Sequence, residues 1–376
     1  MQAKEWFRDA TDTNSRFRFS SNDYLEGRAL SDITFAEPLA SVTVERAYVE
    51  PYHSKSVGLV SHGGLRDFGA AFPLFGYHLR VSRNARLVMS ARRPHLDHFD
   101  EVDFIPGRWL YGGELMHHFG HFMAESSHRL YQVSDYGKER LPQGLAYDGV
   151  VFSSRMGLKP FAKELICRYY GISESRLLLV RDRPAIIDEL TVVPQGSILG
   201  GGPLSSEYLE YLNFYQDRNA AGLGAHGASA PKKLFVGRGH IEGGGGSIQD
   251  EAIIEEYVAS KGFTSVRPEE YPLLEQLNLF RHAEAVVGIG GSFVHLFDHL
   301  GQTNAATFLI SRGDPDGFYH DRSLDQKVAA LEYYQPRAER GDEVVAGERD
   351  GRTHHTTRYR RDLLLDALST FLNKHA

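Results

Sequence analysis

The chain has 376 residues, 41% of them hydrophobic and 24% charged, which is a globular composition that excludes disordered and collagen-like chains. The formal net charge of −7 argues against a broad nucleic-acid-binding surface, and the one cysteine, Cys167, excludes a disulfide framework and is expected to be a buried small hydrophobe. No run approaches the roughly 18 apolar residues that span a bilayer and no signal peptide is visible, so we expect a cytoplasmic protein with at most peripheral membrane association.

The first third of the chain is predicted to be rich in strands. Residues 1–30 are polar, and an alternating apolar pattern follows from about Ile33 to Ser90. Within that pattern, the segments that favour strands are 41–46, 79–82 and 86–90. A stretch rich in histidine, from about His117 to Val133, is then compatible with a helix.

After Gly144 the pattern changes to alternating strands and helices. Asp148–Ser153 and Arg176–Arg181 are short apolar runs that predict buried strands. Between them, Pro160–Tyr170 predicts a helix with proline in its first turn and Gly171 at its end. A βαβ order of this kind indicates a parallel sheet.

A helix over about 205–219 leads into a Gly/Ala/Ser-rich stretch from Ala220 to Pro231, which is the most linker-like segment of the chain. At about 150 residues per domain, the length predicts two domains. We therefore expect the boundary between about Pro194 and Pro231.

The segment after this boundary predicts a Rossmann-like unit. Apolar runs that favour strands lie at 233–237, 263–267, 285–289 and 307–310. Helices are predicted between them, one after a capping-box-like start at Ser247–Asp250, one over 272–283 and one from Ser292 to Leu300. The tail is polar up to an amphipathic helix from Arg361 to Leu372.

Two features of this unit could bind an anion. Gly290, Gly291 and Ser292 lie between a predicted parallel strand and a helix, where backbone N–H groups can hold a phosphate; the alternative is that these glycines serve packing alone. Arg238 directly follows the first strand and would face that helix start, forming a diphosphate clamp. The alternative for Arg238 is a surface salt bridge.

The histidine-rich stretch is the third candidate. On a continuous helix, His117, His121 and Glu125 would fall on one face, and such a row beside a cleft could remove a proton from a sugar hydroxyl. Two alternatives remain open. The three residues could form a metal site, or the histidines could simply pack at a domain interface.

Three segments together resemble family 61 glycosyltransferases. They are Gly120–Glu125 followed by His128–Leu130, then Leu234–Arg238 with Asp250–Glu251 and Gly262–Phe263, and then Glu275–Leu277 leading to Val287–Ser292. The resemblance covers roughly residues 110–312. Two departures are visible: glycines occupy 243–246, where the family usually has a further basic residue, and no histidine precedes the glycine turn.

The resemblance implies a GT-B fold, an α/β architecture of two Rossmann-like domains facing a cleft, here with extra N-terminal strands. It also implies a nucleotide-sugar donor, usually UDP-linked, inversion at the anomeric carbon, and a glycan acceptor in surface or capsular polysaccharide synthesis. The residues expected near the donor are Arg238, Gly290, Gly291, Ser292, Glu275 and Gln276, with His240 and His295 flanking the phosphate site.

On this basis we expect an acceptor-side domain over 1–200, a nucleotide-sugar-binding domain over 201–330, and a tail over 331–376. The terminal helix would either cross back to the first domain or pack within its own. Glu125 is the first candidate for the base, His121 the second and His118 a further one. No metal or other cofactor is expected, since Asp314-Pro-Asp316 is read as a turn. The alternative functions are an inactive nucleotide- or sugar-binding module and a His/Glu metal hydrolase.

Overall fold

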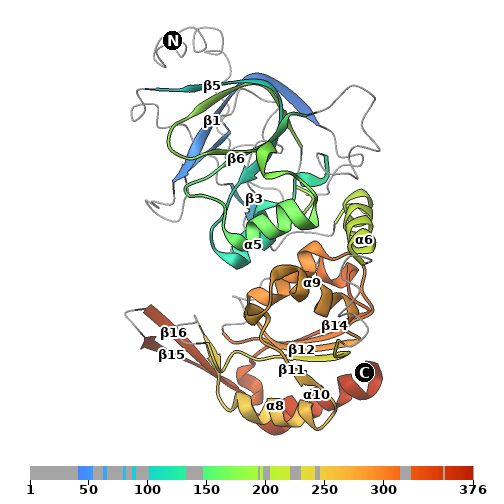
Figure 1. Ribbon diagram of the computed structural model, residues 1–376. Helices are drawn as coiled ribbons and strands as arrows, with labels where there is room; N and C mark the ends of the chain where they lie inside the picture. Colours follow the sequence, from blue (N-terminus) through green and yellow to red (C-terminus); the bar gives the residue numbers. More distant parts are fainter. Residues whose placement is uncertain are drawn as a thin grey trace. The chain divides into compact units, whose positions relative to one another are not determined.

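A computed structural model describes residues 41–53, 62–65, 79–81, 87–89, 101–132, 147–193, 195–197, 204–220, 230–241, 246–313, 323–349 and 352–375. The chain divides into two compact units, Met1–Tyr211 and Leu212–Ala376 (Figure 1). The predicted polar segment 1–30, most of the linker-like segment, the glycines at 243–245, and Asp314 and Asp316 lie outside the described residues.

The first unit contains a six-stranded sheet in the order β2-β1-β8-β5-β6-β7. Its strands are β1 (Val42–His53), β2 (His62–Leu65), β5 (Asp103–Glu114), β6 (Gly149–Ser153), β7 (Leu177–Val180) and β8 (Ala185–Val192). β8, β5, β6 and β7 run parallel to one another, whereas β1 is antiparallel to both of its neighbours. A separate hairpin pairs β3 (Leu79–Val81) with β4 (Leu87–Met89). The strands predicted at 79–82, 86–90, 148–153 and 176–181 are therefore confirmed.

The central strand β5 was not predicted, because Pro106, Gly107 and Gly113 interrupt its apolar pattern. The structure accommodates them at two irregularities. The pairing of β5 with β8 shifts between Ile105 and Arg108, and Gly107 there has a φ of +92°. Its pairing with β6 shifts at Gly113, where φ is +98°. Bulges of this kind allow proline and glycine inside a sheet.

The helix predicted over Pro160–Tyr170 is confirmed, although only α5 (Pro160–Lys163) is α-helical and η5 (Glu164–Tyr169) is a π-helix. Gly171 ends it with a φ of +72°. Cys167 lies in η5 and is only partly buried.

The continuous helix predicted over His117–Val133 is wrong in its extent. Helical structure begins with α3 (Phe119–His121), continues as the π-helix η3 (Phe122–Ser126), breaks, and resumes as the short 3₁₀ turn η4 (Leu130–Gln132). The residues before α3 extend from β5 instead, because the Leu115 N–H donates to the Ser153 carbonyl and the Met116 N–H to the Ser126 hydroxyl, each at 2.8 Å.

The second unit contains a five-stranded sheet in the order β11-β9-β12-β13-β14, in which every neighbouring pair is parallel. Its strands are β9 (Lys233–Val236), β11 (Thr264–Ser265), β12 (Ala285–Ile289), β13 (Ala306–Ile310) and β14 (Ala330–Tyr334). The predicted parallel α/β unit is confirmed. Along the sheet, the direction of chain progression reverses between β9 and β12, and ligands of such sheets bind at that reversal.

Helices cover both faces of this sheet. α9 (Leu273–His282) lies on one face, and α8 (Glu251–Ala259) and α10 (Arg361–His375) lie on the other (Figure 1). The buried side chains of α10 join the same core as those of α8 and the strands, since Leu368 and Phe371 cluster with Val258 and Phe308. The terminal helix therefore packs within its own unit. No helix in the described ranges is long and apolar enough to cross a membrane.

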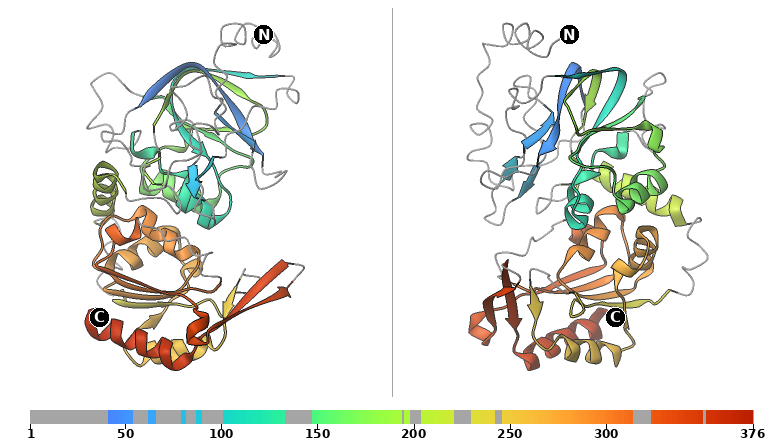
Figure 2. Two further views of the ribbon diagram at one scale, coloured as in Figure 1. Left: turned by 180° about the vertical axis from the view of Figure 1, so that it is seen from behind. Right: turned by 60° about the vertical axis from the view of Figure 1, so that its left-hand side comes forward.

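One prediction for the second unit is wrong. Ser247 does not cap a helix: Ser247–Ile248 forms the short strand β10, and α8 begins only after Asp250, whose φ is +61°. The polar tail before the terminal helix forms strands that were not predicted. It contains β14 and the hairpin of β15 (Glu343–Arg349) and β16 (Arg352–Arg358), which extends from the unit in both views of Figure 2. The polar composition of this hairpin hides it from a pattern search.

Candidate functional site

Three neighbouring strands of the second unit end together at one edge of its sheet. Val236 of β9 pairs with Gly288 of β12, and Ile289 of β12 pairs with Ile310 of β13. The chain therefore leaves β9 toward Arg238, β12 toward Gly290–Ser292, and β13 toward Arg312 at the same level. This is the carboxyl edge of a parallel sheet, at the reversal between β9 and β12.

Arg238 and the glycine turn lie against each other, as expected. A Cβ atom built on Gly291 would lie 2.6 Å from Nη1 of Arg238, so no side chain fits there while the guanidinium keeps its place. Gly291 also precedes η8 (Ser292–His299), whose first N–H groups have no partner within the helix. Gly290 differs from its neighbours, because its N–H donates to the Ile310 carbonyl at 2.8 Å and is committed to the sheet.

Glu251 holds the turn that carries Arg238. The backbone N–H groups of Arg238 and Gly239 both donate to Oε1 of Glu251, the second at 2.7 Å. A Cβ atom on Gly237 would lie 2.6 Å from the same oxygen, so glycine makes room for the carboxylate. Glu251 is 9% exposed at the start of α8 and was not predicted as a site residue. The only signal for it was its place in the second of the three resembling segments.

The Arg238 guanidinium is in an unusual environment for a surface arginine. Burial lowers its pKa, and the negative charges of Glu251 and Glu269 act in the opposite direction. Its Nε atom is buried without a hydrogen-bond partner, and no ion pair joins Arg238 to a carboxylate within the described part of the chain. A half-buried cation with unused donors is suited to receive an anion.

The other residues expected near the donor divide into two groups. His240 contacts Glu269 through Nε2, and Glu269 in turn lies near Arg238, so these three groups form one cluster. Burial acts to raise the pKa of Glu269, but the His240 contact and the Arg238 charge outweigh it and hold the pKa below its usual value.

In the second group, Gln276 and His295 are held by neighbouring residues. Nε2 of Gln276 donates to the Tyr271 carbonyl at 2.8 Å, while Glu275 is exposed in the first turn of α9. His295 lies on η8, where its Nδ1 is 2.9 Å from Oδ2 of Asp298. Asp298 also pairs with the buried Lys327, whose Nζ is 3.6 Å from Oδ1.

The first unit brings His121 and Glu125 together. Nδ1 of His121 lies 2.6 Å from Oε1 of Glu125, across the junction of α3 and η3. The two side chains differ in access: that of Glu125 is 0% exposed, whereas that of His121 is 47% exposed. His118 is also exposed, and its ring centroid is 5.5 Å from that of His121. These residues follow β5 and so lie beyond the carboxyl end of a parallel strand.

His117 is not on the helical face that the row required. It precedes α3, and burial lowers its pKa, with the positive charges of Arg155 and Lys159 acting in the same direction and a backbone hydrogen bond to Met156 opposing them. In the part of the chain that the structure describes, no three His, Cys, Asp or Glu residues are placed to hold a metal ion together. The row of His117, His121 and Glu125 is therefore not assembled as a ligand set.

Arg129 connects the segment that follows His121 and Glu125 to the rest of the first unit. Its guanidinium is fully buried, Nε donates to the Val193 carbonyl at 3.0 Å, and Nη2 donates to Oε1 of Gln195 at 3.4 Å. A Cβ atom on Gly113 would lie 2.9 Å from Nη1, so the irregularity in β5 makes room for the guanidinium. Arg129 thus connects the segment after η3 to β5 and to the end of β8.

Comparison with known proteins gives one family model that matches part of the chain. Residues 119–297 match the family model described as Glycosyltransferase 61. A search of curated proteins found no match. The matched segment begins at α3 and ends in η8, so it contains the His121–Glu125 pair, Arg238 and the glycine turn. Over this segment, the chain is similar to family 61 glycosyltransferases.

Proposed function

We propose that the protein is an inverting, metal-independent glycosyltransferase of GT-B architecture, which transfers a sugar from a UDP-sugar donor to a glycan acceptor. The observation that carries this proposal is the contact of the Arg238 guanidinium with Gly291, at the point where the sheet of the second unit reverses its direction. From the resemblance we extend the proposal to surface-polysaccharide synthesis in the cytoplasm.

The second unit would stabilise the leaving group. As the sugar departs, negative charge collects on the nucleoside diphosphate, and fixed positive groups that face this charge lower the barrier. Arg238 would donate to the phosphate oxygens, and the N–H groups at the start of η8 would donate from the adjoining turn. Because these groups belong to the protein, neutralising the diphosphate requires no metal ion.

The first unit would supply the base. Of the two candidates, the geometry favours His121, because its side chain is half exposed whereas that of Glu125 is fully buried. Glu125 would hold the imidazole through Nδ1, which leaves Nε2 to accept the proton of the acceptor hydroxyl. Direct attack by that hydroxyl inverts the anomeric carbon. The mechanism assigns donor and base to different units and therefore requires the facing domains of a GT-B enzyme.

Calorimetric titration of the full chain with UDP, GDP, ADP and CDP, with and without a chelator, tests this proposal. We expect UDP to bind in both conditions and Arg238→Ala to weaken binding by about 10- to 100-fold, since hydrogen bonds to charged groups contribute about 1.5–3 kcal/mol. Arg281→Ala is the matched control, because Arg281 is also a partly buried arginine of this unit but lies at the end of α9.

Three results would contradict the proposal or a part of it. If none of the four diphosphates binds, the second unit is not a donor site. If Arg238→Ala binds UDP as tightly as Arg281→Ala does, the diphosphate assignment of Arg238 is wrong. Binding that disappears with the chelator would refute its metal-independent part.

A further inference from the structure

A second arginine, Arg312, flanks the glycine turn on the side opposite to Arg238. The sheet order β9-β12-β13 places β12 between the two strands that the arginines follow. Each arginine lies two residues beyond the last residue of its strand, Val236 in β9 and Ile310 in β13. Because these strands are in register with β12, both arginines leave the sheet beside Gly290–Ser292. Arg312 lies outside the segment matched by the family model.

The packing around Arg312 depends on a glycine that is distant in sequence. Nη1 of Arg312 donates to the Gly246 carbonyl at 3.4 Å. A Cβ atom on Gly246 would lie 2.8 Å from the Arg312 carbonyl oxygen and 3.4 Å from Nη1, so any larger residue would press on the arginine. The sequence Gly243–Gly246 contains no charged side chain. The glycine thus leaves space that Arg312 occupies.

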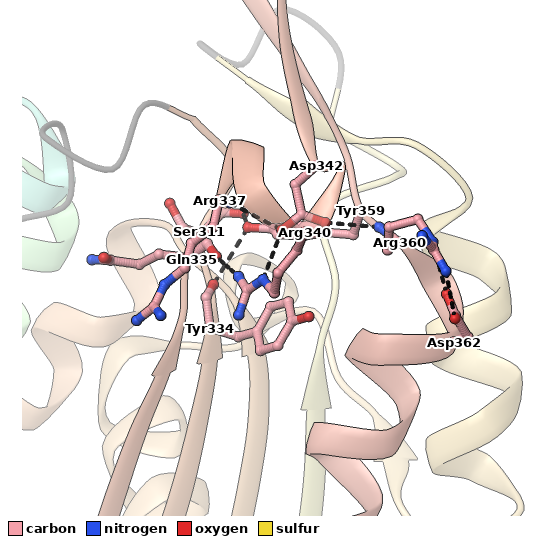
Figure 3. A network of polar contacts seen from close by, with 9 residues as sticks. All are labelled: Ser311, Tyr334, Gln335, Arg337, Arg340, Asp342, Tyr359, Arg360 and Asp362. Carbon is pink, nitrogen blue, oxygen red and sulfur yellow. Dashed lines mark hydrogen bonds and ion pairs between the residues drawn. The ribbon is translucent and has the colours of Figure 1, made fainter.

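The residue before Arg312 is held on both sides (Figure 3). The Tyr359 hydroxyl donates to the Ser311 carbonyl at 2.6 Å, and the Ser311 N–H donates to the Tyr334 carbonyl at 2.9 Å. Tyr359 follows β16, so the C-terminal segment fixes the direction in which the chain leaves β13.

That anchor is itself supported by Asp342. One oxygen of Asp342 accepts the backbone N–H of Arg337 at 3.0 Å, and the other accepts that of Arg360 at 2.8 Å (Figure 3). The Arg340 guanidinium, 4.4 Å from the ring centroid of Tyr334, donates to Asp342 as well. A polar network therefore fixes the backbone that leads into Arg312, and its residues are not among those predicted for the donor site.

Two partly buried positive charges lie close together at this edge, and Glu251 and Glu269 act on Arg238 alone. Burial lowers the pKa of Arg312 to about 10, and the positive charge of Arg238 acts in the same direction. Within the described residues, no ion pair joins either guanidinium to a carboxylate. Two like charges that are both largely removed from water raise the energy of the ligand-free protein, and an anion between them would relieve it.

We propose that Arg312 is a second ligand of the donor diphosphate, which it holds together with Arg238 from the two sides of the glycine turn. This inference rests on the proposed function and deepens it. Two guanidinium groups match two phosphate groups, so the pair selects a nucleoside diphosphate over the corresponding monophosphate.

Titration of the full chain with UDP and with UMP tests the assignment, using Arg312→Ala, Arg312→Lys and Arg238→Ala, with Arg281→Ala as the matched control. We expect Arg312→Ala to weaken UDP binding at least tenfold and to weaken UMP binding less, so that the preference for the diphosphate falls. Arg312→Lys keeps the charge but loses the planar fork, and should weaken UDP binding several-fold. Without ligand, Arg312→Ala should melt no lower than the parent, because a like-charge repulsion is removed.

The outcomes separate the two proposals. If Arg238→Ala weakens UDP binding but both Arg312 variants bind like Arg281→Ala, Arg312 is not a ligand and the donor site stands without it. A lowered melting temperature of Arg312→Ala with unchanged UDP affinity would assign Arg312 a structural role instead. If Arg312→Ala does not fold, Arg312→Lys is the deciding variant. Parental UDP affinity of Arg312→Lys would then overturn the proposal. If UDP does not bind the parent protein, both proposals fall.

Discussion

In both units, parallel strands end together at the carboxyl edge of a sheet. The residues that follow those strands carry different types of side chain in the two units. In the first unit, the chain after β5 carries imidazoles and the buried carboxylate of Glu125. In the second, the chain after β9 and β13 carries guanidinium groups on either side of a glycine turn. In the proposed function, the shared backbone geometry creates the place for a ligand, and the residues that directly follow each strand would supply its chemistry: proton removal in one unit and anion binding in the other.

The buried arginine of the first unit and the two arginines at the sheet edge of the second unit also differ in their partners. Arg129 is fully buried and donates to protein oxygens, whereas Arg238 and Arg312 are less buried and have no carboxylate partner among the described residues. A buried cation whose donors are satisfied supports the fold. A cation with unused donors at a strand end is available to a ligand.

The largest effect is expected when the proposed base, His121, is removed. His121→Ala should lower the transfer rate by about 10²- to 10⁴-fold, the usual contribution of a general base, while UDP affinity measured by titration stays unchanged. Because the His121 side chain is half exposed, added imidazole should restore part of the rate. Glu125→Gln should lower the rate as well, without rescue by imidazole.

His118→Ala is the control for that experiment, since His118 is the exposed neighbour of His121. A His121→Ala enzyme that transfers sugar at the parental rate would refute the assignment. A large loss in His118→Ala alone would transfer the role to His118.

The next largest effect concerns stability. Arg129→Met should reduce the free energy of unfolding by about 3–5 kcal/mol, because it leaves the polar partners of a buried guanidinium unpaired. Arg238→Ala should change the stability of the ligand-free protein much less, because Arg238 satisfies no buried carboxylate with its side chain in the described structure. Chemical denaturation of both variants measures the difference. Equal losses in the two would remove the distinction between a structural and a binding arginine.

The smallest effect is on the pH dependence of stability. Burial keeps the pKa of His117 below its usual 6.5, so the unfolded chain takes up a proton at higher pH than the folded chain does. The His117 contribution to the free energy of unfolding is therefore fully present above pH 6.5 and is lost as the pH falls below it. His117→Gln should flatten this acid limb in denaturation curves measured between pH 7 and 5. An identical acid limb in both proteins would contradict the burial argument.

Local sequence patterns predicted several strands of the second unit correctly. Lys233–Gly237, Ala285–Ile289 and Thr307–Ile310 are short, mainly apolar runs, and each forms a strand close to its predicted bounds. The same logic found Arg238 and the glycine turn, because strand ends and helix starts can be located from neighbouring residues.

The same rules failed where long-range pairing overrides the local signal. β5 is central to its sheet despite a proline and several glycines, because bulges absorb them against β6 and β8. Ser247 has the pattern of a helix cap, but its segment pairs with β16, more than a hundred residues later. The His117–Glu125 row failed for a similar reason, since backbone bonds to Ser153 and Ser126 hold the chain extended before α3.

The amino-acid pattern alone was enough to predict the α/β character, the parallel strands of the second unit, the i, i+4 pairing of His121 with Glu125, and the resemblance to family 61 glycosyltransferases. These properties depend on the period of the apolar pattern and on residues a few positions apart. The folded structure was needed to show that Glu125 is buried while His121 is accessible, and that Arg312 lies beside the glycine turn. Burial and strand order depend on contacts between segments that are distant in sequence. Around Arg312, these contacts come from Gly246 and from Tyr359, which bonds to Ser311, and no local pattern encodes them.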